Sequence, residues 1–126
     1  MAVLSYNSLM PDDVPPLLVC VKDLLFGSKV TATARAHNVA FRGVRDYGRL
    51  LEMPAAHLIM DLNAAGAVEA AAAWRAKFGG KVTGFVSHVD ADTIAAARSA
   101  GLDRVLTNGA FTAQLEEIVR STVSVS

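Results

Sequence analysis

The sequence predicts an α/β protein built around a doubly wound, five-stranded parallel sheet in the order 2-1-3-4-5. Short apolar runs alternate along the chain with segments whose apolar residues recur at helical spacing. The connections between these segments are short. Alternating strands and helices joined by right-handed crossovers form a parallel sheet that helices cover on both faces. The 126 residues, of which 52% are hydrophobic, suit one domain with a buried core.

Five segments are predicted as strands because they are short and mainly apolar. They are residues 17–21, 39–44, 57–61, 82–86 and 104–106. The first is almost wholly apolar, which is typical of a central parallel strand that is buried on both faces. The third begins at His57, which we expect, like His37, to be an ordinary surface or strand-edge residue.

A helix is predicted after each strand, and polar or glycine residues mark the helix ends. Asp46 and Asp90 are placed as N-caps of the second and fourth helices. Asn38 ends the first helix, and Gly101 ends the fourth as a residue that adopts the left-handed conformation. The predicted bounds are about 26–38, 46–52, 67–78, 90–101 and from about 112 onward.

Residues 1–16 are predicted to form an N-terminal extension to the domain at 17–126. Pro11, Pro15 and Pro16 disfavour helix there, so a mobile leader is expected. The alternative is that its apolar side chains dock on this or a neighbouring subunit.

Charge and the length of the apolar runs argue against nucleic acid and membrane as partners. Lys and Arg number 12 and Asp and Glu also number 12, whereas nucleic-acid binding needs an excess of basic residues on one face. No apolar run reaches the roughly 20 residues of a membrane span, and the N-terminus lacks the basic start of a secretory signal. The single cysteine, Cys20, suits a reducing compartment. We expect a cytoplasmic protein that binds neither nucleic acid nor membrane.

Polar residues gather where the predicted strands end. They are Lys22, Asp23, Asp61, Asn63, Ser87, His88, Thr107 and Asn108. In an open parallel sheet, ligands bind at the carboxyl ends of the strands. Asp23 and Asp61 follow strands that should be adjacent, and paired carboxylates are ligands that Mg²⁺ uses. The Ser87 hydroxyl could reach a phosphoryl group carried by Asp61.

This arrangement resembles a response-regulator receiver domain over about residues 17–122. Asp61-Leu62-Asn63 matches the phospho-acceptor segment, and Ser87 matches the Ser/Thr switch position. Ala100-Gly101-Leu102-Asp103 resembles the turn before the fifth strand, and Phe111 fits the aromatic after it. The resemblance implies a flavodoxin-like fold, a phospho-acceptor at Asp61 and a role in a two-component phosphorelay. The implied partners are proteins, such as a histidine kinase or an output protein.

Two departures from the receiver pattern indicate an atypical or pseudo-receiver. Lys22 occupies the first of two acidic positions after the first strand, so that only Asp23 remains. Asn108 occupies the position of a lysine that contacts the phosphoryl group, and the segment has an extra residue and lacks the proline. We expect Lys22 to pair with Asp61 in place of a metal. The expected cofactor is therefore none, or Mg²⁺ weakly bound by Asp23 and Asp61.

A competing hypothesis is a small-ligand-binding or enzymatic domain that uses the same crevice, with Asp23, Asp61 and His88 as its polar groups. Each of these residues also has a simpler interpretation, because either aspartate could cap neighbouring backbone and His88 could be an exposed loop residue. The sequence has no nucleophile elbow, Cys–His pairing or glycine-rich phosphate loop. We therefore predict a non-enzymatic domain.

Two surface features complete the predictions. Self-association is expected through the face built by the fourth helix, the fifth strand and the last helix, since the fourth helix carries the small residues Ala95, Ala96, Ala97 and Ala100. A cluster of arginines in the second strand–helix unit is interpreted as a solvated face. Its members are Arg35, Arg42, Arg45 and Arg49.

Overall fold

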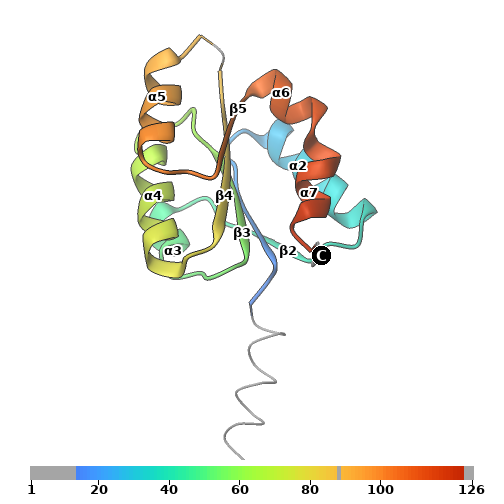
Figure 1. Ribbon diagram of the computed structural model, residues 1–126. Helices are drawn as coiled ribbons and strands as arrows, with labels where there is room; N and C mark the ends of the chain where they lie inside the picture. Colours follow the sequence, from blue (N-terminus) through green and yellow to red (C-terminus); the bar gives the residue numbers. More distant parts are fainter. Residues whose placement is uncertain (1–13, 88, 124–126) are drawn as a thin grey trace, which may run out of the picture.

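The computed structural model describes residues 14–87 and 89–123. A parallel sheet of five strands forms its middle layer, in the order β2-β1-β3-β4-β5 (Figure 1). The strands are β1 (Leu17–Cys20), β2 (Phe41–Gly43), β3 (His57–Asp61), β4 (Lys81–Val86) and β5 (Arg104–Thr107). The predicted fold class and strand order are confirmed, and the predicted second strand is shortened to three residues.

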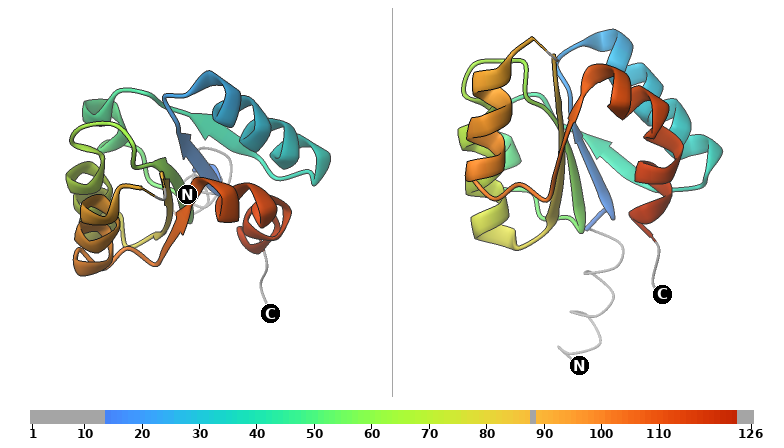
Figure 2. Two further views of the ribbon diagram at one scale, coloured as in Figure 1. Left: turned by 90° about the horizontal axis from the view of Figure 1, so that it is seen from above. Right: turned by 45° about the horizontal axis from the view of Figure 1, so that its top comes forward.

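Helices cover both faces of the sheet (Figures 1 and 2). On one face lie α2 (Leu24–Ala36), α6 (Asn108–Ala113) and α7 (Leu115–Ser121). On the other lie α3 (Tyr47–Leu50), α4 (Ala67–Phe78) and α5 (Ala91–Ser99). Two apolar clusters fill the spaces between the sheet and these layers. In the described part of the chain, no helix is both long and apolar enough to cross a membrane.

The caps predicted from the sequence are present. The Asp46 carboxylate accepts a hydrogen bond from the Arg49 N–H at 3.2 Å. The Asp90 carboxylate accepts one from the Thr93 N–H at 3.1 Å. Asp23 does the same for Phe26 at 3.0 Å, so it caps α2. Asn38 lies in the left-handed region with φ of 57° at the end of α2. These local signals fix where the helices start and stop.

The last helical segment begins earlier than predicted. The Thr107 hydroxyl accepts a hydrogen bond from the Ala110 N–H at 3.2 Å, and this cap starts α6 directly at the end of β5. Phe111 is consequently helical and fully buried, and its ring stacks on that of Phe85 with the centroids 4.3 Å apart. The segment bends at Gln114 before α7. The sequence analysis missed this helix start because no apolar periodicity follows Thr107 directly to mark it as a cap.

His57 is neither exposed nor at a strand edge, contrary to the prediction. Its exposed fraction is 1%, and its Nδ1 and Nε2 atoms lie 2.7 Å from Thr122 Oγ1 and 2.8 Å from Thr83 Oγ1. Burial lowers the pKa of His57 to about 4, and the nearby positive charge of Lys81 adds to this effect. The histidine joins the start of β3 to the C-terminal end of α7. His37, by contrast, lies 3.5 Å from Glu116 near the surface.

Candidate functional site

Asp61 is the last residue of β3, at the carboxyl edge of the sheet. Its exposed fraction is 5%, and its Oδ1 atom accepts hydrogen bonds from the backbone N–H and the side-chain Nδ2 of Asn63, both at 2.9 Å. Within the described residues, both hydrogen bonds of this carboxylate go to Oδ1. The other oxygen, Oδ2, is therefore the one with a lone pair to offer to a ligand or a phosphoryl group.

Asn63 also links β3 to the end of β4. Its Oδ1 atom accepts a hydrogen bond of 2.9 Å from the Ser87 N–H. The three residues Asp61, Asn63 and Ser87 are thus brought together, as the sequence predicted, and Asn63 is the bridge between them. Among the described residues, the Ser87 hydroxyl accepts a single long contact of 3.4 Å, from the Val89 N–H, which leaves it available at the rim.

A glycine in β4 allows this loop to close over the sheet. The Leu62 N–H donates to the Phe85 carbonyl at 2.9 Å, and the Leu62 side chain lies over Gly84. A Cβ atom on Gly84 would lie 2.5 Å from Leu62 Cδ1, which is closer than atoms can approach. The absence of a side chain at Gly84 therefore sets the position of Leu62 and, through it, of Asn63.

Lys22 does not pair with Asp61, so this prediction is wrong. Among the described residues no ion pair joins them, and the Lys22 ammonium lies 4.4 Å from the centroid of the Tyr47 ring. A cation above an aromatic face is attracted by the electron density of the ring. Tyr47 begins α3, directly after the Asp46 cap, and so presents its ring beside the end of β1.

Tyr47 is the residue at this site that the sequence analysis missed. Its hydroxyl is buried and has no hydrogen-bond partner among the described residues. Burial raises the pKa of Tyr47, and the nearness of Cys20, which repels a phenolate only once it is itself deprotonated, and of the Asp61 carboxylate raises it further. The phenol therefore stays protonated near the Asp61 carboxylate. An aromatic residue directly after a helix cap was the available signal, but it is too common to single out.

Cys20 lies beneath the same site and is inert. It is buried in the core between the sheet and α4, and burial raises the pKa of its thiol to about 11. A thiol with so high a pKa holds its proton at neutral pH and is a poor nucleophile. This agrees with the structural role expected for the single cysteine.

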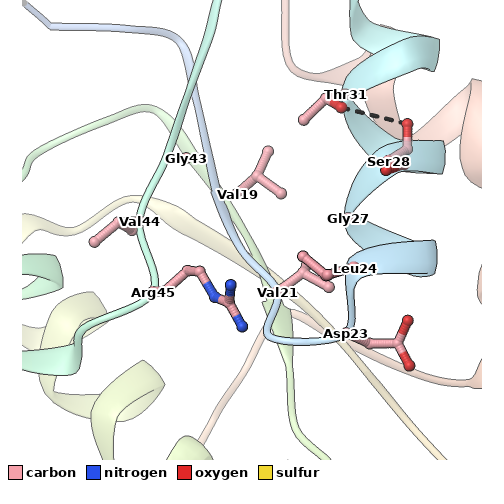
Figure 3. Close-up of a pocket in the computed structure, with 10 residues that line it drawn as sticks. All are labelled: Val19, Val21, Asp23, Leu24, Gly27, Ser28, Thr31, Gly43, Val44 and Arg45. Carbon is pink, nitrogen blue, oxygen red and sulfur yellow. Dashed lines mark hydrogen bonds between the residues drawn. The ribbon is translucent and has the colours of Figure 1, made fainter.

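The two predicted metal ligands have different roles in the structure. Asp23 is exposed, and its carboxylate caps α2 by accepting the hydrogen bond from the Phe26 N–H, whereas Asp61 is buried at the end of β3. Asp23 also lines a hollow with Leu24 and Gly27, which Figure 3 shows. In the described part of the chain, no three His, Cys, Asp or Glu residues are grouped as metal ligands.

Of the last two predicted pocket residues, the structure describes Asn108 only. Asn108 opens α6, and its Oδ1 atom is buried without a hydrogen-bond partner in the described part of the chain. In the resemblance drawn from the sequence, this amide takes the position of a lysine. His88 lies outside the described residues.

Comparisons with known proteins give a result for the fold alone. No family model matches the chain, and no curated protein matches it in sequence. The receiver domain of NtrX from Brucella abortus has a TM-score of 0.72 at 12% identity, with 87% of this chain and 99% of that chain covered. A longer NtrX structure from the same organism is covered over 27% of its length.

Two further solved structures share the fold. A response regulator from Thermotoga maritima has a TM-score of 0.65 at 17% identity, with 89% of this chain and 99% of that chain covered. A response regulator from Burkholderia pseudomallei, solved with a phosphorylated aspartic acid, a calcium ion and citrate, has a TM-score of 0.65 at 13% identity. It is covered over 65% of its length by 82% of this chain. The chain has the fold of response-regulator receiver domains.

Proposed function

We propose that this chain is a cytoplasmic, non-enzymatic receiver-like module that signals through protein contacts, with Asp61 as a degraded phospho-acceptor. The observation that carries the proposal is the placement of Asp61 at the end of β3 in a receiver fold, bridged by Asn63 to Ser87. The Burkholderia pseudomallei structure of this fold holds a phosphorylated aspartic acid. Asp61 is the buried carboxylate at the corresponding edge of this chain.

Two features support a reduced acceptor rather than a fully active one. Acceptance of a phosphoryl group requires attack by a carboxylate oxygen on phosphorus, while the bond from phosphorus to the donor's leaving group breaks and the leaving group takes the electron pair. Mg²⁺ normally assists by neutralising charge on the phosphoryl oxygens. Lys22 places a positive charge near the ion site, and Asp23 is engaged as a cap, so any bound Mg²⁺ should be held weakly.

Asn108 takes the position of the lysine that contacts the phosphoryl group in receivers, so the site also lacks that positive charge. An amide can donate a hydrogen bond to a phosphoryl oxygen but carries no charge, and charge-assisted hydrogen bonds are about twice as strong as neutral ones. The phosphorylated form should consequently be stabilised less than in a receiver with lysine at this position. Signalling through protein partners, such as a histidine kinase or an output protein, then depends more on the surface than on the acceptor.

The proposal includes self-association through α5, β5 and α7. Ala95, Ala96 and Ala100 are exposed on α5 and would permit close approach of a second copy. Ala97 is buried in the core and does not contribute to that surface. A dimer by this route should bury about 1,000 Å² or more in total.

Intact-mass measurement after incubation with Mg²⁺ and acetyl phosphate tests the acceptor. We expect slow and incomplete addition of one phosphoryl group, and no addition to the Asp61→Asn variant. An Asp92→Asn variant, which alters an exposed carboxylate in the first turn of α5, is the matched control. Equal labelling of Asp61→Asn and the unaltered chain would exclude Asp61 as the acceptor.

A further inference from the structure

Strand β2 forms one edge of the sheet and pairs with β1 alone. The Val44 N–H donates to the Val19 carbonyl at 3.0 Å, so this position turns its backbone groups toward β1. In a parallel strand alternate residues point their N–H and C=O groups to opposite sides. The backbone groups of Phe41 and Gly43 therefore face outward, where a further strand could pair with them.

Arginines surround a hollow on the α3 side of this edge. Arg42, Arg45 and Arg49 line a volume of about 480 Å³ together with Asp46 and Met53. In the described part of the chain, none of these arginines belongs to an ion pair. The Asp46 carboxylate is bound to the Arg49 N–H at the start of α3. The Arg45 guanidinium donates a hydrogen bond of 3.0 Å to the Lys22 carbonyl and also lines the hollow on the other face of β2, so Arg42 and Arg49 supply the charge of the α3-side hollow.

The arginine at the opposite edge of the sheet, on β5, differs from Arg42 and Arg49 because its guanidinium group has partners within the chain. On β5, Arg104 donates a hydrogen bond of 2.9 Å to Glu117 on α7 and another to Gln114. The arginine at that edge is therefore satisfied within the chain. Arg42 and Arg49 at the β2 edge have no ion pair among the described residues and are positioned to bind carboxylates from outside the chain.

A mainly apolar hollow, whose lining also includes Asp23 and Arg45, lies on the other face of the same strand end. It occupies about 360 Å³ between β2 and α2, and Figure 3 shows Val19 and Val21 at its base. Leu24, with 73% of its surface exposed, stands at its rim. Gly43 leaves the hollow open, because a Cβ atom there would contact nothing closer than the Val19 carbonyl at 4.0 Å.

We propose that the β2 edge binds an extended segment of a partner protein in which acidic and apolar residues alternate, as an added strand of the sheet. Side chains of a strand alternate between its two faces. The acidic side chains would enter the hollow lined by Arg42 and Arg49, and the apolar ones would enter the hollow between β2 and Leu24. Backbone pairing with Phe41 and Gly43 would supply the remaining contacts.

The arginines on one face of β2 and the apolar hollow on the other together favour a partner segment with alternating acidic and apolar residues. A second copy paired edge to edge would bring arginines against arginines, which is unfavourable. A nucleic acid could satisfy the guanidinium groups, but it would not fill the apolar hollow on the α2 side. The inference names one kind of partner for the proposed module, and it does not depend on phosphorylation of Asp61.

Two capped peptides of identical composition test the proposal. In one, glutamate and valine alternate, and in the other the glutamates and the valines form separate blocks. We expect the alternating peptide to bind at least about tenfold more tightly and to shift the amide NMR signals of Phe41 and Gly43. Methylation of every second peptide nitrogen should abolish binding in one frame and spare it in the other, because only one set of N–H groups faces β2.

Variants separate charge from shape. The double variant Arg42→Glu, Arg49→Glu should no longer bind the peptide of alternating glutamate and valine. It should instead bind a peptide in which lysine and valine alternate. The matched control is Arg98→Glu with Arg120→Glu, which changes exposed arginines on α5 and α7. Gly43→Val places its Cβ at ordinary contact distance and extends into the apolar hollow, so it should weaken binding while leaving the arginines in place. Circular dichroism establishes that each variant is folded.

Several results would overturn the proposal. They are equal affinity for the alternating and block peptides, insensitivity to N-methylation, or tighter binding of a single-stranded oligonucleotide than of the alternating peptide. Absence of peptide binding together with dimerisation of an Arg42→Thr variant would show that the arginines only block edge pairing. Peptide binding by Asp61→Asn should equal that of the unaltered chain, so failure of the acceptor proposal and failure of this one are distinguishable.

Discussion

The ammonium group of Lys22 lies 4.4 Å from the ring centroid of Tyr47, over α3 rather than against Asp61. In the resemblance drawn from the sequence, Lys22 takes the position of an acidic residue. A positive charge there opposes the binding of a divalent cation even when the ammonium group lies over Tyr47. The Asp61 carboxylate obtains its hydrogen bonds from Asn63 instead. The separation of Lys22 from Asp61 leads to the first prediction.

Replacement of Lys22 by aspartate should create a Mg²⁺ site. The change removes a cation and adds a carboxylate beside Asp23, so the affinity for Mg²⁺ should rise by about tenfold or more. Titration with Mg²⁺ monitored by NMR measures it, with Lys29→Asp on the exposed surface of α2 as control. Tight Mg²⁺ binding by the unaltered chain, equal to that of the variant, would contradict the prediction.

Substitution of Gly84 by alanine should destabilise the fold and displace the loop that holds Asn63. The added Cβ would overlap Leu62, and overpacking of this kind costs about 1–3 kcal/mol. Urea denaturation gives the free energy of unfolding, and the amide shift of Ser87 reports the loss of its bond to Asn63. Gly109→Ala, which introduces a Cβ into open space in α6, should leave both unchanged or raise stability slightly.

His57 should make stability depend on pH. Its pKa falls from 6.5 in the unfolded chain to about 4 in the folded one, so the unfolded state binds more protons between these values. The contribution is fully present above about pH 6.5 and is lost as pH falls toward about 4, by about 3 kcal/mol. Lys81 and Arg104 add positive charge near the ring and Asp103 opposes it, with the net effect downward.

The free energy of unfolding, measured by urea at several pH values, tests this account of His57. His57→Gln should remove most of the slope below about pH 6.5. His37→Gln, at the partly exposed pair with Glu116, should retain it. An identical slope in the unaltered chain and in His57→Gln would show that another group controls acid stability.

Asp103 should contribute to stability mainly through a backbone group. Its carboxylate accepts two hydrogen bonds from Arg75, at 2.9 and 3.0 Å, and one of 2.8 Å from the Val82 N–H. Asp103→Ala leaves the partly buried Val82 N–H without its acceptor, which costs about 1–3 kcal/mol. Arg75→Ala removes only an exposed ion pair and should cost less. Equal losses in the two variants by urea denaturation would contradict this order.

The sequence predicted the strand order and the position of Asp61 because apolar periodicity and strand ends are local properties of the chain. The Asp46 and Asp90 caps were predictable for the same reason. His57 was not, because its burial depends on hydroxyl groups from β4 and from the end of α7. The position of Lys22 over Tyr47 likewise depends on how α3 packs beside β1, which no local pattern specifies.

The rate of phosphorylation by acetyl phosphate, followed by intact mass, tests the central claim most directly. The comparison is between the unaltered chain and a variant that combines Lys22→Asp with Asn108→Lys, which restores both charges of the receiver pattern. We predict that the variant is labelled at least about tenfold faster and depends on Mg²⁺, whereas the unaltered chain is labelled slowly with or without the ion. Rapid, Mg²⁺-dependent labelling of the unaltered chain at the rate of the variant would contradict the account.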